Sequence, residues 1–269
     1  MMPIKCDIKP VEITKDEYHQ LDYKVMGIIF EIHKDLGRLC DEKIYQKQIL
    51  NLCREAKIAA LEEVPIEIYH KNFSKVYYAD LIINNRIIYE LKTANSISPQ
   101  HRKQILNYLF LTGFKYGKLV NMRPNSVGSE FINTNISPEI RYKFEIITKD
   151  WHDLNSESIW LRNLVSDLIK DWGVYLDFEL FYEAIAYFKG GYDNFIKPID
   201  IISEGTTIGI QKMGLLTPEI SVHISSIKDS PESQETHLLR LLKHTSLKAI
   251  HWINFNRNKI TMKTLIKET

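Results

Sequence analysis

The sequence predicts an α/β protein made of two similar halves, and three observations support this prediction. Residues 20–125 show helical and strand periodicities in the order α-α-β-β-β-α-β. The same order of patterns returns after residue 150. The chain has 269 residues, of which 44% are hydrophobic and 26% charged, so it can bury one large core or two ordinary ones.

The elements of the first half follow from the apolar spacing and from the residues that begin and end them. A helix over 21–36 carries apolar residues at helical spacing and stops at Gly37, and a later helix begins at Ser98-Pro99. Runs rich in β-branched and aromatic residues predict the strands between these helices. The predicted helices are 21–36, 41–56 and the one from Ser98, and the predicted strands are 64–69, 76–83, 87–92 and 116–122.

The second half repeats the first at a nearly constant spacing. Val25–Gly37 aligns with Leu161–Gly173 at an offset of 136, and Pro65–Ile68 aligns with Pro198–Ile201 at an offset of 133. A constant offset is what an internal duplication leaves, although two unrelated α/β patterns can also match by chance because helical periodicity is degenerate. At the second offset Thr112 matches Thr245, Lys115 matches Lys248, and Asn121 matches Asn254.

The composition between the halves predicts a linker. Residues 126–150 begin with a stretch rich in Pro, Asn and Ser and continue with a charged one. We therefore expect a first domain over 1–125, a linker over 126–150, and a degenerate copy over 151–269.

Three charged residues in the hairpin at 76–92 form a candidate site. Strand interiors are poor places for charges unless the charges are paired or bind a metal. A three-residue loop, Asn84–Arg86, sets Asp80 directly across from Glu90, whereas a two-residue turn puts them on opposite faces. Lys92 then shares the face of Glu90. The plain alternative is a surface hairpin whose Asp, Glu and Lys are solvated.

The chemistry of these residues suits a divalent cation. Mg²⁺ (or Mn²⁺) prefers oxygen ligands and is usually held by one or two carboxylates together with substrate phosphate and water. Asp80 and Glu90 supply the carboxylates, and the Leu91 carbonyl supplies a third oxygen. Without a metal the two acids repel, so at least one pKa should be raised. Lys92 is placed to orient a water or to stabilise charge on a phosphate.

Two helical residues are further candidates for this site. Glu42, from the helix before the sheet, could bind a second metal or a metal-bound water, and Gln104 could position Lys92 or a phosphate. For both, the alternative is a solvent-facing side chain on a helix surface. The second half has no such charges: Asp80, Glu90, Lys92 and Gln104 fall on Met213, His223, Ser225 and His237, and Glu42 falls on Phe178.

The net charge of +1 hides an uneven distribution. Residues 70–125 hold nine lysines and arginines against two acids, a formal charge of +7, and the rest of the chain carries −6. A basic field around two acids suits a polyanion brought to a metal, although a solvated basic face is an equal alternative. The predicted nucleic-acid contacts are Lys71, Lys75, Arg102 and Lys103.

The sequence offers little sign of export or of a membrane. No apolar run approaches the ~18 residues of a membrane span, and the first residues lack the apolar region of a signal peptide. Cys6, Cys40 and Cys53 are odd in number and lack metal-binding spacing. We expect a cytoplasmic protein without a membrane partner.

Asp80 followed by Glu90-Leu91-Lys92 resembles the signature of the PD-(D/E)xK nuclease superfamily, and Gln104 with Tyr108 resembles the Q-x-x-x-Y helix of some branches. Ala79 stands where the signature has its Pro. The resemblance spans roughly residues 20–125. It implies a restriction-endonuclease-like core, a mixed central sheet flanked by helices, with metal-dependent phosphodiester hydrolysis.

A closer resemblance is to the GxxExxY family of that superfamily. It rests on LGRLCDEKIY (36–45), in which Glu42 and Tyr45 match the Glu and Tyr of the name, while Leu39 stands in place of its Gly. The resemblance implies supporting roles for Tyr45 and Tyr108.

Three functional hypotheses follow. The first is an Mg²⁺-dependent endonuclease acting on nucleic acid, DNA in the first instance, through a single site in the N-terminal half. The second is a non-catalytic nucleic-acid-binding module on a nuclease fold. The third is an interaction protein whose C-terminal half recruits a protein partner through Trp160, Trp172 or Trp252, which otherwise belong to the core.

Overall fold

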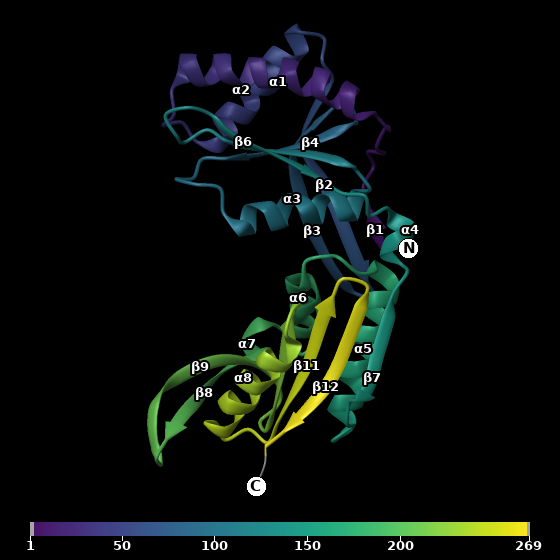
Figure 1. The fold of residues 1–269 in the computed structure, drawn as a ribbon, viewed down its shortest axis with the longest axis vertical. Helices are drawn as coiled ribbons and strands as arrows, with labels where there is room; N and C mark the ends of the chain where they lie inside the picture. Colours follow the sequence, from purple (N-terminus) through teal and green to yellow (C-terminus); the bar gives the residue numbers. More distant parts are fainter. Residues whose placement is uncertain (1–2, 268–269) are drawn as a thin grey trace. The chain divides into compact units, whose positions relative to one another are not determined.

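The computed structural model describes residues 3–267 and divides the chain into two compact units, residues 1–140 and 141–269. Each unit contains one six-stranded mixed sheet flanked by helices (Figure 1). The predicted α/β class is therefore confirmed, and the two sheet-bearing units fit the predicted duplication.

The sheet of the first unit has the strand order β1-β2-β3-β4-β5-β6. Neighbours are antiparallel except β4 and β5, which are parallel because helix α3 (Pro99–Thr112) crosses over between them. The strands are β1 (Ile4–Lys5), β2 (Ala60–His70), β3 (Phe73–Ile83), β4 (Ile87–Lys92), β5 (Tyr116–Asn121) and β6 (Gly128–Asn133).

Helices cover both faces of this sheet. On one face, α1 (Lys15–Leu36) and α2 (Glu42–Glu55) pack their buried residues against the inward side chains of β3, β4 and β5. Helix α3 lies on the other face (Figure 1), where Ile105 approaches Gly117 of β5 so closely that a side chain there would clash. As predicted, α3 starts at Pro99, after a Ser98 side chain that caps the helix.

The sheet of the second unit has the order β7-β12-β11-β10-β9-β8. Strands β10 and β11 are parallel and joined by α8, as β4 and β5 are joined by α3. The strands are β7 (Glu145–Asp150), β8 (Ile196–Ser203), β9 (Thr206–Thr217), β10 (Ile220–Ser225), β11 (Ala249–Asn256) and β12 (Lys259–Ile266). The helices are α5 (Ser156–Trp172), α6 (Phe178–Phe188), α7 (Tyr192–Phe195) and α8 (Pro231–Lys243). A short helix, α4 (Pro138–Arg141), lies where the units divide.

A shared side-chain clamp supports the duplication in atomic detail. Asn121, at the end of β5, accepts a hydrogen bond from the Ala94 amide (3.1 Å) and donates one to the Ala94 carbonyl (2.7 Å). Asn254, at an offset of 133, does the same to Ile227 (2.8 and 3.0 Å), which is Ala94 at that offset. Two unrelated sheets have no reason to share such a contact between equivalent residues.

The segment expected as a linker is part of both sheets. Within 126–150, β6 pairs along its whole length with β5, and β7 pairs with β12. The predicted linker is therefore corrected to a boundary near residue 140. Both strands lie at sheet edges and bury little, so their apolar alternation is weak beside the Pro, Asn and Ser around them.

Candidate active site

The β3–β4 hairpin has the loop that the sequence predicts. Asn84 and Asn85 adopt left-handed conformations (φ 51° and 53°), which asparagine tolerates. The ladder pairs Ile83 with Ile87 and continues to Leu81 opposite Tyr89. The ladder ends there. Beyond it, the Asp80 carboxylate accepts a hydrogen bond from the Leu91 amide (2.7 Å), and its charge acts on Glu90, so the two acids are close.

Glu90 is fully buried and only half of its carboxylate is satisfied. Lys92 donates a hydrogen bond to Glu90 Oε1 (2.7 Å), whereas Glu90 Oε2 has no hydrogen-bond partner among the described residues, 3–267. A buried carboxylate oxygen without a partner is costly, so it indicates a group that this structure does not contain.

The two acids and the lysine shift one another's pKa. Burial, followed by repulsion from Asp80, raises the pKa of Glu90 to about 8. Burial raises the pKa of Asp80 to about 6, although Lys92 opposes the shift. Burial alone would lower the pKa of Lys92, but Glu90 more than offsets it and the pKa is raised. The expected rise of a carboxylate pKa is thus present at both acids.

Helix α2 reaches the site through its first turn and a half. Glu42 is the first residue of α2, and its Oε1 lies 3.9 Å from Lys92 Nζ. Gln46, one turn later, is buried and donates a hydrogen bond to the Asp80 carbonyl (2.6 Å). Gln46 was not among the residues predicted for the site, although its i+4 spacing from Glu42 places both on one helix face.

Tyr45 fastens the turn that leads into α2. Its hydroxyl donates to the Gly37 carbonyl (2.7 Å) and accepts from the Cys40 amide (3.2 Å). Gly37 carries the positive φ of this turn (71°), whereas Leu39 does not have a positive φ and is exposed. The position of Leu39 therefore does not require glycine.

Helix α3 contributes a pair of side chains beside the acids. Gln104 donates its amide to the Tyr108 hydroxyl (2.9 Å), and the Tyr108 ring lies against Tyr77 (centroids 5.8 Å apart). Burial and then the charge of Glu90 raise the pKa of Tyr108. The amide of Gln104 binds Tyr108, and its suggested role in positioning Lys92 or a phosphate stays a prediction.

The four predicted nucleic-acid contacts lie on two elements and in different surroundings. Lys71 is exposed in the turn between β2 and β3, Lys75 on β3 lies over the Tyr77 ring (4.7 Å), and Lys103 is on α3. Arg102 forms two hydrogen bonds of 2.6 Å with Glu130 of β6.

The ion pair of Arg102 has a reversed counterpart in the second unit. At an offset of 133, Arg102 and Glu130 become Glu235 and Lys263, which pair at 2.7 Å. The pair is kept with its charges exchanged, and it joins a helix to a strand in each unit: α3 to β6 in the first, and α8 to β12 in the second. The charge of Arg102 is consequently paired with that of Glu130.

The donor set suits a hard divalent cation that also uses ligands from outside the protein. Within residues 3–267 no three His, Cys, Asp or Glu side chains gather as metal ligands. Asp80 and Glu90 therefore offer two carboxylates, with Glu90 Oε2 free to bind. Two carboxylates, completed by water and phosphate oxygens, are what Mg²⁺ commonly uses.

This segment can be compared with known proteins. Residues 19–132 match the family model of the PD-(D/E)XK nuclease superfamily. The match includes the whole site from Glu42 to Tyr108, and the first unit has the fold of that superfamily. None of the curated proteins matches the chain. The crystal structure of SSO0001 is similar at 24% identity over 44% of this chain and 58% of that one, with a TM-score of 0.28.

The second unit has strands equivalent to those of the first unit, but it lacks the charged residues of the candidate site. His223, in the place of Glu90, lies near Gln234 (3.3 Å), and burial lowers its pKa. Ser225, in the place of Lys92, donates to Asn254 (2.9 Å) and accepts from Trp252 (2.8 Å). These neutral side chains satisfy one another and offer no carboxylate to a metal.

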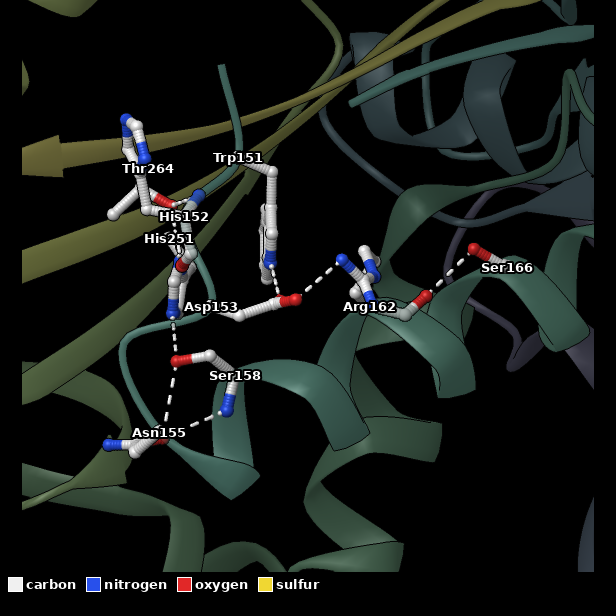
Figure 2. A network of polar contacts seen from close by, with 9 residues as sticks. All are labelled: Trp151, His152, Asp153, Asn155, Ser158, Arg162, Ser166, His251 and Thr264. Atoms are coloured by element: carbon white, nitrogen blue, oxygen red, sulfur yellow. Dashed lines mark hydrogen bonds and ion pairs between the residues drawn. The ribbon is translucent and has the colours of Figure 1, made fainter. Parts of the chain in front are cut away.

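A polar network in the second unit contains a serine and a histidine in contact (Figure 2). His251 lies 2.8 Å from Ser158 Oγ and 3.1 Å from Thr264 Oγ1, and its ring stacks on Trp151 at 4.1 Å. Ser158 and His251 are fully buried, so a substrate cannot reach them. This arrangement is not a hydrolytic triad.

The same network corresponds to a half-buried ion pair of the first unit. Ser158 and His251 fall on Asp22 and Lys118, which pair at 2.8 Å between α1 and β5. In both units this position ties the first long helix to the second parallel strand. The first unit uses an ion pair, and the second unit uses a neutral hydrogen bond.

No helix in the described part of the chain is both long and apolar enough to cross a membrane.

Proposed function

We propose that this protein is a divalent-metal-dependent nuclease that hydrolyses phosphodiester bonds in nucleic acid, DNA in the first instance, at one site in the first unit. The observation that carries the proposal is the unpartnered, buried Glu90 Oε2 beside the Asp80 carboxylate. Two such carboxylates are unfavourable in their ionised forms when no cation is bound, as their raised pKa values indicate, and a divalent cation between them would relieve this cost.

Each residue of the site has a separate role in the proposed hydrolysis. Asp80, Glu90 and the Leu91 carbonyl would hold the cation, which would supply positive charge to the phosphate and acidify a water. Lys92 is protonated and anchored on Glu90, so it donates hydrogen bonds to the attacking water or to a phosphate oxygen. Glu42 orients water from the side of α2.

Three side chains position this machinery without being catalytic residues. Gln46 holds the Asp80 backbone to α2, and Tyr45 holds the turn before Glu42. Tyr108, in contact with Gln104, excludes water next to Glu90. The second unit, which has none of the charges, serves as a structural or binding half and is the place where a protein partner would attach.

Cleavage assays test the proposal. Supercoiled plasmid, linear duplex, single-stranded DNA and RNA are each incubated with Mg²⁺, Mn²⁺ or EDTA and wild type, Asp80→Asn or Lys92→Met. Asp200→Asn, which changes an exposed carboxylate on β8 of the second unit, is the matched control. We expect metal-dependent cleavage by wild type and the control, reduced by at least about 100-fold in both site variants.

Each other outcome is informative. Cleavage that survives in Asp80→Asn and Lys92→Met would assign the activity to another site or to a contaminant. Metal-independent binding of nucleic acid by all four proteins, without cleavage, would replace the nuclease with a non-catalytic binding module.

A further inference from the structure

Two arginines that no part of the proposed mechanism uses lie at the rim of the site. Arg123 Nε donates to the carbonyl of Thr93, the residue after Lys92, at 3.2 Å. Arg38 Nη1 donates to the Arg123 carbonyl at 3.4 Å, and Arg38 belongs to the turn that leads into Glu42. Arg123 thus binds the backbone directly after Lys92, and Arg38 binds the backbone of Arg123 from the turn that precedes Glu42.

The turn before α2 confirms this placement. Burial raises the pKa of Tyr45, and the nearby charge of Arg123 opposes the shift; the Tyr45 hydroxyl binds Gly37 and Cys40 within the same turn. In the parallel ladder Lys92 stands opposite Asn121, and the Lys92 carbonyl accepts from the Met122 amide at 2.8 Å. Arg123 is the residue after Met122. Its side chain therefore starts beside the end of β4, where it binds the Thr93 carbonyl.

The positive charge of each arginine is not paired with an acidic side chain of the described residues. Over residues 3–267, neither forms an ion pair with a carboxylate, and their hydrogen bonds go to backbone carbonyls. Arg102 and Arg162, by contrast, each bind a carboxylate. Arg38 is exposed and Arg123 is half-buried, so N–H groups remain for a ligand.

The second unit acts as an internal control for these positions. Arg38 corresponds to Val174 at the offset of 136, and Arg123 corresponds to Asn256 at the offset of 133. Asn256 donates to the Lys228 carbonyl at 3.5 Å, so the fold is maintained there without a guanidinium. The asparagine clamp is present in both units, at Asn121 and Asn254. Arg38 and Arg123, by contrast, are present in the first unit, which also carries the acidic residues of the site, and are replaced in the second.

We propose that Arg38 and Arg123 together bind a phosphate group of the nucleic-acid backbone adjacent to the bond that is cut. This inference rests on the proposed function and names its phosphate contacts. A guanidinium presents parallel N–H donors that match phosphate oxygens, and two of them offset the charge that the carboxylates present to a polyanion. They position the substrate and do not touch the reacting atoms.

Binding as a function of salt concentration tests the inference. Fluorescein-labelled duplex DNA and single-stranded DNA are titrated with wild type, Arg38→Gln, Arg123→Asn and the double variant in EDTA, over a series of NaCl concentrations. Each lost phosphate contact should reduce the slope of log affinity against log salt by about 0.9 on duplex or about 0.7 on a single strand. Arg123→Asn installs the residue of the second unit, so the fold should be kept.

Arg86→Gln is the charge-matched control. Arg86 ends the β3–β4 loop, and Lys92 ends β4, so the two ends of the strand are about 20 Å apart. We expect Arg86→Gln to retain the wild-type slope. In cleavage assays the arginine variants should raise KM more than they lower kcat, with circular dichroism spectra unchanged.

The outcomes separate the inference from the function on which it rests. If wild type cuts and the slopes of Arg38→Gln and Arg123→Asn equal that of wild type, the nuclease stands and the inference falls. An equal decrease in Arg86→Gln would also overturn it, because the effect would then be general charge. If the two slopes decrease but nothing is cut, the phosphate site stands and the nuclease falls. If wild type neither binds nor cuts, both fall.

Discussion

Replacing Glu90 by glutamine should make the metal-free first unit less sensitive to pH. The folded state raises the pKa of Glu90 from 4.5 to about 8, so the folded protein retains a proton that the unfolded chain releases. The free energy of unfolding consequently falls as the pH rises between these two values. Between pH 5 and pH 7 we expect Glu90 to reduce it by about 2–3 kcal/mol in the wild type.

Glu90→Gln cannot ionise and should lose this contribution, leaving the smaller one of Asp80, whose pKa is raised in the same direction. Mg²⁺ should stabilise the wild type above pH 7, because it binds the folded carboxylate pair and not the unfolded chain. Glu90→Gln should show little stabilisation by Mg²⁺ and no cleavage. Glu31→Gln, at an exposed carboxylate on α1, is the control.

The two units can be followed separately. All four tryptophans (Trp151, Trp160, Trp172 and Trp252) lie in the second unit, so tryptophan fluorescence reports its unfolding alone. Far-ultraviolet circular dichroism follows both units in the same urea titration. A first-unit transition with the same midpoint at pH 5 and pH 7 in EDTA would refute the reasoning, and so would an equal pH dependence in Glu90→Gln.

Three further predictions concern stability. Burial lowers the pKa of His251 to about 4, so the second unit should lose about 2 kcal/mol from pH 7.5 to pH 5, opposite to the first unit; fluorescence-detected unfolding of His251→Gln should lack this loss. Asn121→Ala and Asn254→Ala should each destabilise their own unit by about 1–3 kcal/mol, because Asn121 binds three backbone groups and Asn254 binds two; an unchanged transition of the unit that carries the substitution would contradict the clamp. Arg102→Glu with Glu130→Arg should recover most of the stability lost in either single variant, which a double-mutant cycle measures; no coupling would refute the ion pair.

The sequence alone determined the order of the elements and the hairpin register. The asparagines at 84 and 85 allow left-handed backbone, and the three-residue loop they form sets which residues face each other from Asp80 to Glu90. The repeat offsets of 133 and 136 also follow from the sequence, and the matching clamps of Asn121 and Asn254 agree with them. These features are local or periodic, so spacing along the chain is enough to predict them.

Only the tertiary structure decided which long-range partners each side chain meets. Arg102 forms an ion pair with Glu130, twenty-eight residues away, and Gln46 of α2 donates a hydrogen bond to the carbonyl of Asp80 in β3. The edge strand β6 likewise escaped prediction because pairing with β5, more than its own pattern, makes it a strand. Spacing along the chain does not encode which side chains meet across elements, or how deeply a carboxylate such as that of Glu90 is buried.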